Sequence, residues 1–255
     1  MASLRFAYST INWGETPDLA ATFAAIREAG WSAVELFNHS LDWLGTTERL
    51  LRLLDGLEVA TGFGMFEVPL DSTRLEIQKR RIEAMAALGA EAYGLVGGTR
   101  LRWRPPSETE EADLARACET LAEHGAAHGV TVAYHPHVAC TVETEAEIDR
   151  LLQRTRVLTL CLDASHIALV GEDPITHLRK YRERTSYVHL KDWGRGAFQE
   201  LGQGTLDIDF AGFLRELETT AFPGWVVVEQ SRSDVSPERS AAVNAAYVRG
   251  LGYEI

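Results

Sequence analysis

Short apolar runs alternate with longer amphipathic segments along the whole chain. The short runs are rich in β-branched and aromatic residues, which is typical of buried strands. They predict eight strands, at Leu4–Ile11, Trp31–Phe37, Leu57–Phe63, Glu91–Val96, Val130–His135, Val157–Leu162, Ser186–Leu190 and Trp225–Glu229. The longer segments place apolar residues on one helical face, as Leu19, Phe23 and Ile26 do in the first of them.

These longer segments predict eight helices, several of which end at a glycine or begin at a proline. They cover Asp18–Ala29, Thr46–Asp55, Ser72–Leu88, Glu108–His128, Thr144–Arg154, Pro174–Arg184, Ile208–Thr219 and Pro237–Leu251. Strict alternation of strand and helix requires a parallel sheet with crossover helices. Eight repeats favour a closed barrel, and no GxGxxG motif follows the first strand to suggest a dinucleotide-binding sheet. We therefore predict an α/β fold, a single (β/α)8 TIM barrel domain over residues 1–255.

Composition and charge narrow the choice of partners and compartment. The chain has 255 residues, 45% of them hydrophobic, and a net charge of −12, which disfavours a nucleic-acid partner because an acidic surface repels phosphate. Its three cysteines form no CxxC pair, so a reducing cytoplasm fits better than a disulfide framework. The first eleven residues do not resemble a secretion signal, and no apolar run approaches the roughly 20 residues of a membrane span. We expect a cytoplasmic protein with no membrane partner.

Ionisable residues follow the buried runs at several predicted strand ends. In a TIM barrel these ends meet at one rim, where catalytic residues lie. A charge at the end of a buried strand is costly unless it is paired or coordinated. Four candidate metal ligands on neighbouring strands can converge there, namely His135, Asp163, His189 and Glu229. Two imidazoles and two carboxylates suit Mn²⁺, Co²⁺, Fe²⁺ or Zn²⁺ better than Mg²⁺.

Each of these residues also has an ordinary structural explanation. A single Asp or Glu at a strand end is more often a helix cap or an ion-pair partner, but four ligand-type residues on successive strands favour a shared site. Lys191 faces either solvent or the mouth, and Trp13 either walls a sugar ring or packs against the core. Three further histidines fall in predicted helices and are expected to be solvated, namely His124, His128 and His177.

At these residues the chain resembles the xylose-isomerase-like barrel superfamily of sugar isomerases, epimerases and dehydratases. Within that superfamily the resemblance is greatest to the inosose dehydratases (2-keto-myo-inositol dehydratases). The matching stretches are YHPHVACTVETEAEIDRL at 134–151, LDASHIALVGEDP at 162–174, VHLKD at 188–192 and GWVVVE at 224–229. The HPH and HLKD elements together are fairly specific, whereas HLKD alone is shared widely across the superfamily.

The resemblance implies a metal site and a branch of the family. Asp163, His189 and Glu229 match the metal-binding Asp, His and Glu of the family. Sugar epimerases carry a glutamate where His135 stands, which favours the dehydratase branch. This chain also has Ala139-Cys140 where a Gly-Thr usually follows HPH in the dehydratases, so its substrate can differ from theirs.

The resemblance also implies substrate contacts. His166 matches a substrate-contacting histidine, Glu35 an acid near the substrate, and Arg195 an arginine beside it. We expect Glu35, Arg195 and His137 to orient hydroxyl groups. Trp13 is the further substrate-binding candidate.

Together these observations predict a metal-dependent lyase that acts on a small polyol or keto-sugar. The expected reaction is α-proton abstraction, with the enediolate stabilised by one divalent ion, Mn²⁺ or Co²⁺ above others. His166 or Lys191 would be the acid/base group, with Glu229 as a rival for the base.

Other functions remain open at this point. One alternative is a sugar or sugar-phosphate isomerase or epimerase, and another is a non-catalytic or partner-dependent barrel subunit. An abasic-site nuclease is disfavoured because Leu57–Phe63 offers no histidine for its metal cluster. Family members are often dimers or tetramers, so the resemblance also implies a homo-oligomer.

Overall fold

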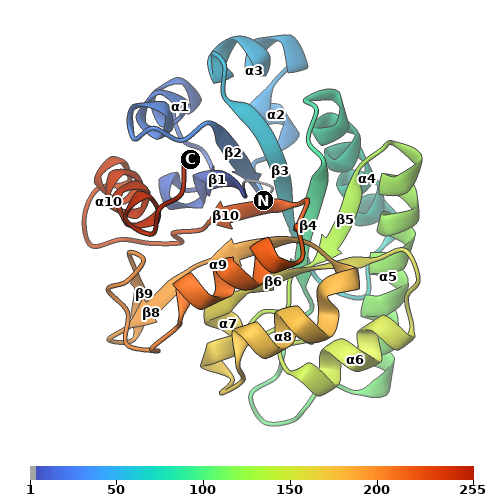
Figure 1. The fold of residues 1–255 in the computed structure, drawn as a ribbon. Helices are drawn as coiled ribbons and strands as arrows, with labels where there is room; N and C mark the ends of the chain where they lie inside the picture. Colours follow the sequence, from blue (N-terminus) through green and yellow to red (C-terminus); the bar gives the residue numbers. More distant parts are fainter. Residues whose placement is uncertain (1–3) are drawn as a thin grey trace.

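Eight parallel strands close into a barrel in the computed structural model, which describes residues 4–255 (Figure 1). The strands follow the order β1-β10-β7-β6-β5-β4-β3-β2 around the barrel. They are β1 (Arg5–Ser9), β2 (Ala33–Phe37), β3 (Glu58–Phe66), β4 (Ala92–Gly97), β5 (Thr131–Tyr134), β6 (Thr159–Asp163), β7 (Thr185–Leu190) and β10 (Trp225–Val228). The predicted (β/α)8 fold is confirmed, while Met1–Ser3, the start of the segment searched for a secretion signal, lie outside the described residues.

Helices connect the strands and surround the barrel (Figure 1). They are α1 (Leu19–Glu28), α2 (Leu41–Leu44), α3 (Thr47–Leu54), α4 (Ser72–Ala87), α5 (Glu108–Ala127), α6 (Glu145–Gln153), α7 (Ala164–Leu169), α8 (Pro174–Tyr181), α9 (Phe210–Thr219) and α10 (Pro237–Gly250). Caps begin several of them, as at Asp18 and Ser107, whose side chains accept hydrogen bonds from backbone N–H groups of the first turn. The short helices α2 and α7 and two 3₁₀ turns were not predicted because they lack a full amphipathic repeat.

An antiparallel hairpin that the strand pattern did not predict follows β7. It consists of β8 (Asp192–Gly194) and β9 (Ala197–Gln199). Arg195 and Gly196 form its two-residue turn, with φ values of 56° and 78°. Positive φ at both turn residues matches the right-handed twist of a tight hairpin. Each strand has only three residues, too few for an alternating pattern to stand out.

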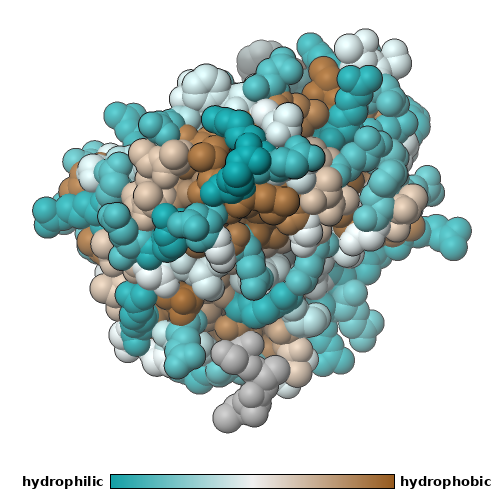
Figure 2. All heavy atoms as spheres, turned by 90° about the horizontal axis from the view of Figure 1, so that it is seen from above, coloured by the Kyte–Doolittle hydropathy of each residue, from teal (hydrophilic) through white to brown (hydrophobic). Residues whose placement is uncertain are grey.

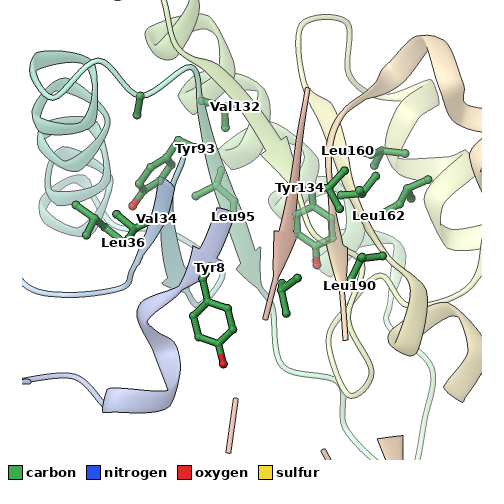
Figure 3. Packing of buried hydrophobic residues seen from close by; sticks show 14 of the residues in the cluster. Tyr8, Val34, Leu36, Tyr93, Leu95, Val132, Tyr134, Leu160, Leu162 and Leu190 are labelled. Atoms are coloured by element: carbon green, nitrogen blue, oxygen red, sulfur yellow. The ribbon is translucent and has the colours of Figure 1, made fainter. Parts of the chain in front are cut away.

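One buried cluster, made mostly of small side chains, lies on the interior face of the barrel. It consists of Ala7, Ala33, Ala60, Ala92, Ala133, Cys161, Tyr187, Trp225 and Val227. A much larger cluster lies between the barrel and its helices and includes Leu160, Leu162 and Leu190 (Figure 3). Because successive side chains of a strand point to opposite faces, the two clusters alternate along each strand. Burying each leucine contributes about 1.5–3 kcal/mol to stability.

Hydrophilic residues cover much of the face of the molecule shown in Figure 2. Hydrophobic residues reach the surface in patches between hydrophilic ones on the face shown in Figure 2. Among residues 4–255, no helix combines the length and apolar character needed to cross a bilayer.

Candidate metal and substrate site

Five ionisable side chains lie on the interior face of the barrel, at the C-terminal ends of its strands. Each stands two residues after a member of the interior cluster: Glu35 after Ala33, His135 after Ala133, Asp163 after Cys161, His189 after Tyr187, and Glu229 after Val227. The period of two in a strand turns these residues to the same face as the cluster members that precede them. All five are at most 4% exposed, so their charges and lone pairs must be satisfied within the barrel.

The four predicted metal ligands come together at this level. One ligand atom from each of His135, Asp163, His189 and Glu229 lies within 4.8 Å of the others. His189 Nδ1 is 2.7 Å from Glu229 Oε2, and His135 Nε2 is 4.0 Å from Asp163 Oδ2. His135 Nε2 and Asp163 Oδ2 have no hydrogen-bond partner within residues 4–255. Buried lone pairs without partners on an imidazole and a carboxylate fit a divalent cation.

Asp163 combines a structural role with this free oxygen. Its Oδ1 accepts hydrogen bonds from the backbone N–H groups of Ser165 (2.7 Å) and His166 (3.0 Å), which caps α7. Burial raises the pKa of Asp163 to about 6. One carboxylate oxygen therefore caps the helix while Oδ2 faces the other ligand candidates.

Glu35 contacts His189 from the side opposite Glu229. Its Oε2 lies 3.0 Å from His189 Nε2 and accepts a hydrogen bond from Thr61 Oγ1 at 2.9 Å. A carboxylate on the second ring nitrogen of a histidine fixes the orientation of the imidazole. Thr61 was not among the predicted site residues, and no local motif distinguishes it from other strand threonines.

Lys191 faces the mouth of the barrel, one of its two predicted positions. It is 2% exposed, and its Nζ lies 2.5 Å from Glu229 Oε1 and 3.5 Å from His166 Nε2. The Phe198 ring of β9 covers this ammonium at 3.9 Å from the ring centroid. Burial alone raises the pKa of Glu229, but the Lys191 ammonium lowers it well below its usual range. The sequence analysis missed Phe198 because it missed the hairpin that carries it.

His137 and His166 form a close pair of tilted rings beside the predicted ligands, with an interplanar angle of 41°. Their ring centroids lie 3.7 Å apart. Burial lowers the pKa of His137 to about 4 and that of His166 well below its ordinary value. Both imidazoles are therefore neutral at pH 7, and each has a lone pair that can accept a proton or a hydroxyl hydrogen bond.

Two predicted substrate residues lie outside this buried group. Arg195 is exposed at the turn of the β8–β9 hairpin. Trp13 is half-buried and packs edge-on against Tyr8, with ring centroids 6.1 Å apart. The expectation that His177 is solvated was wrong, because it is 1% exposed and its Nε2 lies 2.9 Å from Glu172 Oε2.

Comparisons with known proteins agree with this architecture. A family model described as Xylose isomerase-like TIM barrel matches residues 23–251, and the chain belongs to this family. It is 28% identical to the rhizopine catabolism protein MocC of Rhizobium meliloti over 269 residues, which cover 90% of this chain and 82% of MocC. It is 30% identical to the inosose dehydratase of Geobacillus kaustophilus over 241 residues, 78% of this chain and 77% of that enzyme.

A solved structure shares the fold over nearly the whole chain. The IolI protein, solved with a zinc atom bound, superposes with a TM-score of 0.80 at 16% identity, covering 97% of this chain and 98% of IolI. The match to the family model confirms the predicted resemblance to the xylose-isomerase-like barrels, and the IolI structure agrees in fold.

Proposed function

We propose that this chain is a metal-dependent lyase of the inosose-dehydratase type, acting on a polyhydroxylated carbonyl compound. One observation carries the proposal: four ligand-type side chains from four neighbouring strand ends lie within 4.8 Å of one another. Lys191 and His166 lie directly beside them. The 30% identity to an inosose dehydratase over more than three quarters of both chains supports the same reaction class.

The chemistry requires removal of a weakly acidic proton α to a carbonyl group. A divalent ion held by His135, Asp163, His189 and Glu229 would act as a Lewis acid on the charge that develops at the carbonyl oxygen. The mixed nitrogen and oxygen donors make Mn²⁺ and Co²⁺ the first candidates. Zinc belongs in the same test because IolI, which shares the fold, was solved with zinc.

The proton transfers fall to residues around Lys191. Its Nζ lies 2.5 Å from Glu229 Oε1 and 3.5 Å from His166 Nε2, so a proton can pass between Glu229 and His166 through the Lys191 ammonium. The base removes the α-proton, and the electron pair of that C–H bond forms the new carbon–carbon double bond. The β-hydroxyl leaves with its bonding pair, takes a proton from the acid and departs as water. Glu229, His166 and Lys191 are the candidates for these two roles.

Neutral histidines and a carboxylate would orient the substrate. His137 and His166 present neutral rings at the mouth, and Glu35 Oε1 has no hydrogen-bond partner in the described part of the chain. Hydroxyl groups of a polyol can donate to both kinds of acceptor. This set of acceptors supports a polyhydroxylated substrate.

The test is a metal-dependent activity panel. Protein stripped with a chelator is reloaded with Mn²⁺, Co²⁺ or Zn²⁺ and incubated with inosose or with ketohexoses. We expect an enedione chromophore from inosose, abolished in Glu229→Gln and retained in Glu58→Gln, an exposed control at the far end of β3. Full activity in Glu229→Gln overturns the site assignment. Interconversion of ketohexoses without a chromophore would instead assign the chain to the epimerases.

A further inference from the structure

A second group of metal-ligating side chains lies on the outside of the barrel, on α4 and α5. These two helices pack against each other (Figure 1). Glu83 is on α4, His124 lies in the last turn of α5, and His128 is the C-cap residue directly after α5. One ligand atom from each of the three lies within 4.8 Å of the other two. Because α5 ends just before β5 begins, this group lies at the end of the barrel opposite the mouth.

The two histidines have the spacing that metal binding needs, and His128 also has the suitable tautomer. Residues four apart on a helix are neighbours on one face, and these two rings have centroids 4.4 Å apart. His128 Nδ1 lies 2.9 Å from the backbone oxygen of His124. A carbonyl oxygen only accepts, so Nδ1 carries the proton and the Nε2 lone pair of His128 is left for another partner. Metal-ligating histidines commonly donate their second ring N–H to a backbone carbonyl in this way.

Glu83 supplies an oxygen at a suitable separation. Its Oε1 lies 3.1 Å from His124 Nε2. This is a hydrogen-bond distance, so a metal ion would replace the proton that His124 Nε2 donates to Glu83. The separation is also close to the roughly 3.4 Å between two ligands bound to one tetrahedral ion at about 2.1 Å. The Glu83 side chain is 46% exposed and that of His124 19% exposed. Small side-chain rotations at the surface can bring His128 into place as the third ligand. A water molecule can fill the fourth position of a tetrahedral ion.

We propose that Glu83, His124 and His128 form a peripheral site for one divalent transition-metal ion. Two imidazoles and one carboxylate select ions of the Zn²⁺, Ni²⁺ and Cu²⁺ class over Mg²⁺ and Ca²⁺, which prefer all-oxygen sites. The bound ion links α4 to α5 and stabilises the folded chain, because it binds the native arrangement of helices and not the unfolded chain. The site is independent of the reaction proposed for the barrel mouth.

The test counts zinc equivalents in metal-free full-length protein by competition with a chromophoric chelator. We expect His128→Gln and His124→Gln each to bind one equivalent fewer than the wild type, or to bind it at least tenfold more weakly. Glu123→Gln, which removes an exposed charge from the same helix, keeps the wild-type count. If the barrel mouth binds no zinc, the wild type binds one equivalent and the histidine variants none, so this difference does not depend on the proposed function.

A zinc-soaked crystal gives a second, direct measurement. An anomalous peak between Glu83 and the two histidines supports the site, and its loss in His128→Gln confirms the ligand. Equal zinc counts and affinities in the wild type and both histidine variants overturn the proposal. Filling that occurs only at millimolar zinc overturns it as well, because such weak binding is adventitious.

Discussion

Replacing Lys191 with methionine removes the ammonium group beside Glu229 and keeps an unbranched side chain under the Phe198 ring. In the wild type the Lys191 Nζ lies 2.5 Å from Glu229 Oε1, and the side chain is 2% exposed. After the substitution, Glu229 retains the Ser231 hydroxyl at 2.7 Å and the His189 ring at 2.7 Å. The variant therefore leaves a buried carboxylate with part of its compensation removed.

The size of the effect follows from these remaining contacts. Removing one partner of a buried ion pair costs about 3–5 kcal/mol, since the other charge stays buried. Because Glu229 retains two contacts, we expect Lys191→Met to lose stability near the lower end of this range, about 3 kcal/mol. For a chain of this size, such a loss lowers Tm by about 6–12 °C. A divalent ion on Glu229 would replace the lost positive charge. The deficit should then shrink on metal addition, and metal should bind about tenfold more tightly for each 1.4 kcal/mol recovered.

Urea denaturation in chelator and in excess Mn²⁺, with calorimetric Mn²⁺ titration, measures both effects. Lys180→Met is the matched control, because Lys180 makes two surface ion pairs, to Glu145 and Asp149, and its side chain is 35% exposed. Surface pairs contribute about 0–1 kcal/mol, so this control should lose little stability and show no metal dependence.

Two results would refute this reasoning. The first is a loss of less than 1 kcal/mol for Lys191→Met in chelator, which would mean that the ion pair is not buried as described. The second is Mn²⁺ binding that is weaker in the variant than in the wild type, which would mean that the ammonium does not compete with a cation for Glu229. Turnover is a separate readout, because it falls only if Lys191 also transfers a proton.

Three further substitutions test the surroundings of the site. Burial alone raises the pKa of Glu147. Hydrogen bonds from the backbone N–H groups of Glu143 and Thr144 and from Arg100 outweigh this effect, so the pKa lies below its ordinary value. Glu147→Gln should therefore lose about 2 kcal/mol at pH 7. The gap stays full above the unfolded pKa of about 4.3 and closes as the pH falls through the lower folded pKa. Urea denaturation at pH 7 and pH 3 checks this, and an equal gap at both pH values would contradict it. Thr61→Val removes the donor to Glu35 and should cost about 1.5–3 kcal/mol in the same assay, whereas Thr61→Ser should not; equal losses would show that the hydroxyl is not the cause. Phe198→Ala removes the ring over Lys191 and should cost about 1–2 kcal/mol. It should also lower kcat/KM on the substrate found in the activity panel, and wild-type values of both would exclude Phe198 from the site.

Much of the site could be predicted from the order of residues along the chain. Apolar runs bounded by helical segments determined the eight strands, and the barrel rule placed the chemistry at their C-terminal ends. Because side-chain direction repeats every two residues, a small or apolar residue followed two positions later by Asp, Glu or His marks an interior polar position. His135 after Ala133 and Glu229 after Val227 follow this rule.

Only the tertiary structure decided which of these groups meet. His189 lies between Glu35 and Glu229. Its contact with Glu35 joins residues 154 positions apart in the sequence, and this contact forms only because the barrel closes. Closure also placed Lys191 toward the mouth rather than toward solvent. The hairpin carried Phe198 over that lysine while leaving Arg195 exposed at its turn. No local pattern encodes such contacts, because they arise from the packing of segments that are remote in sequence and whose separation is set by the whole fold.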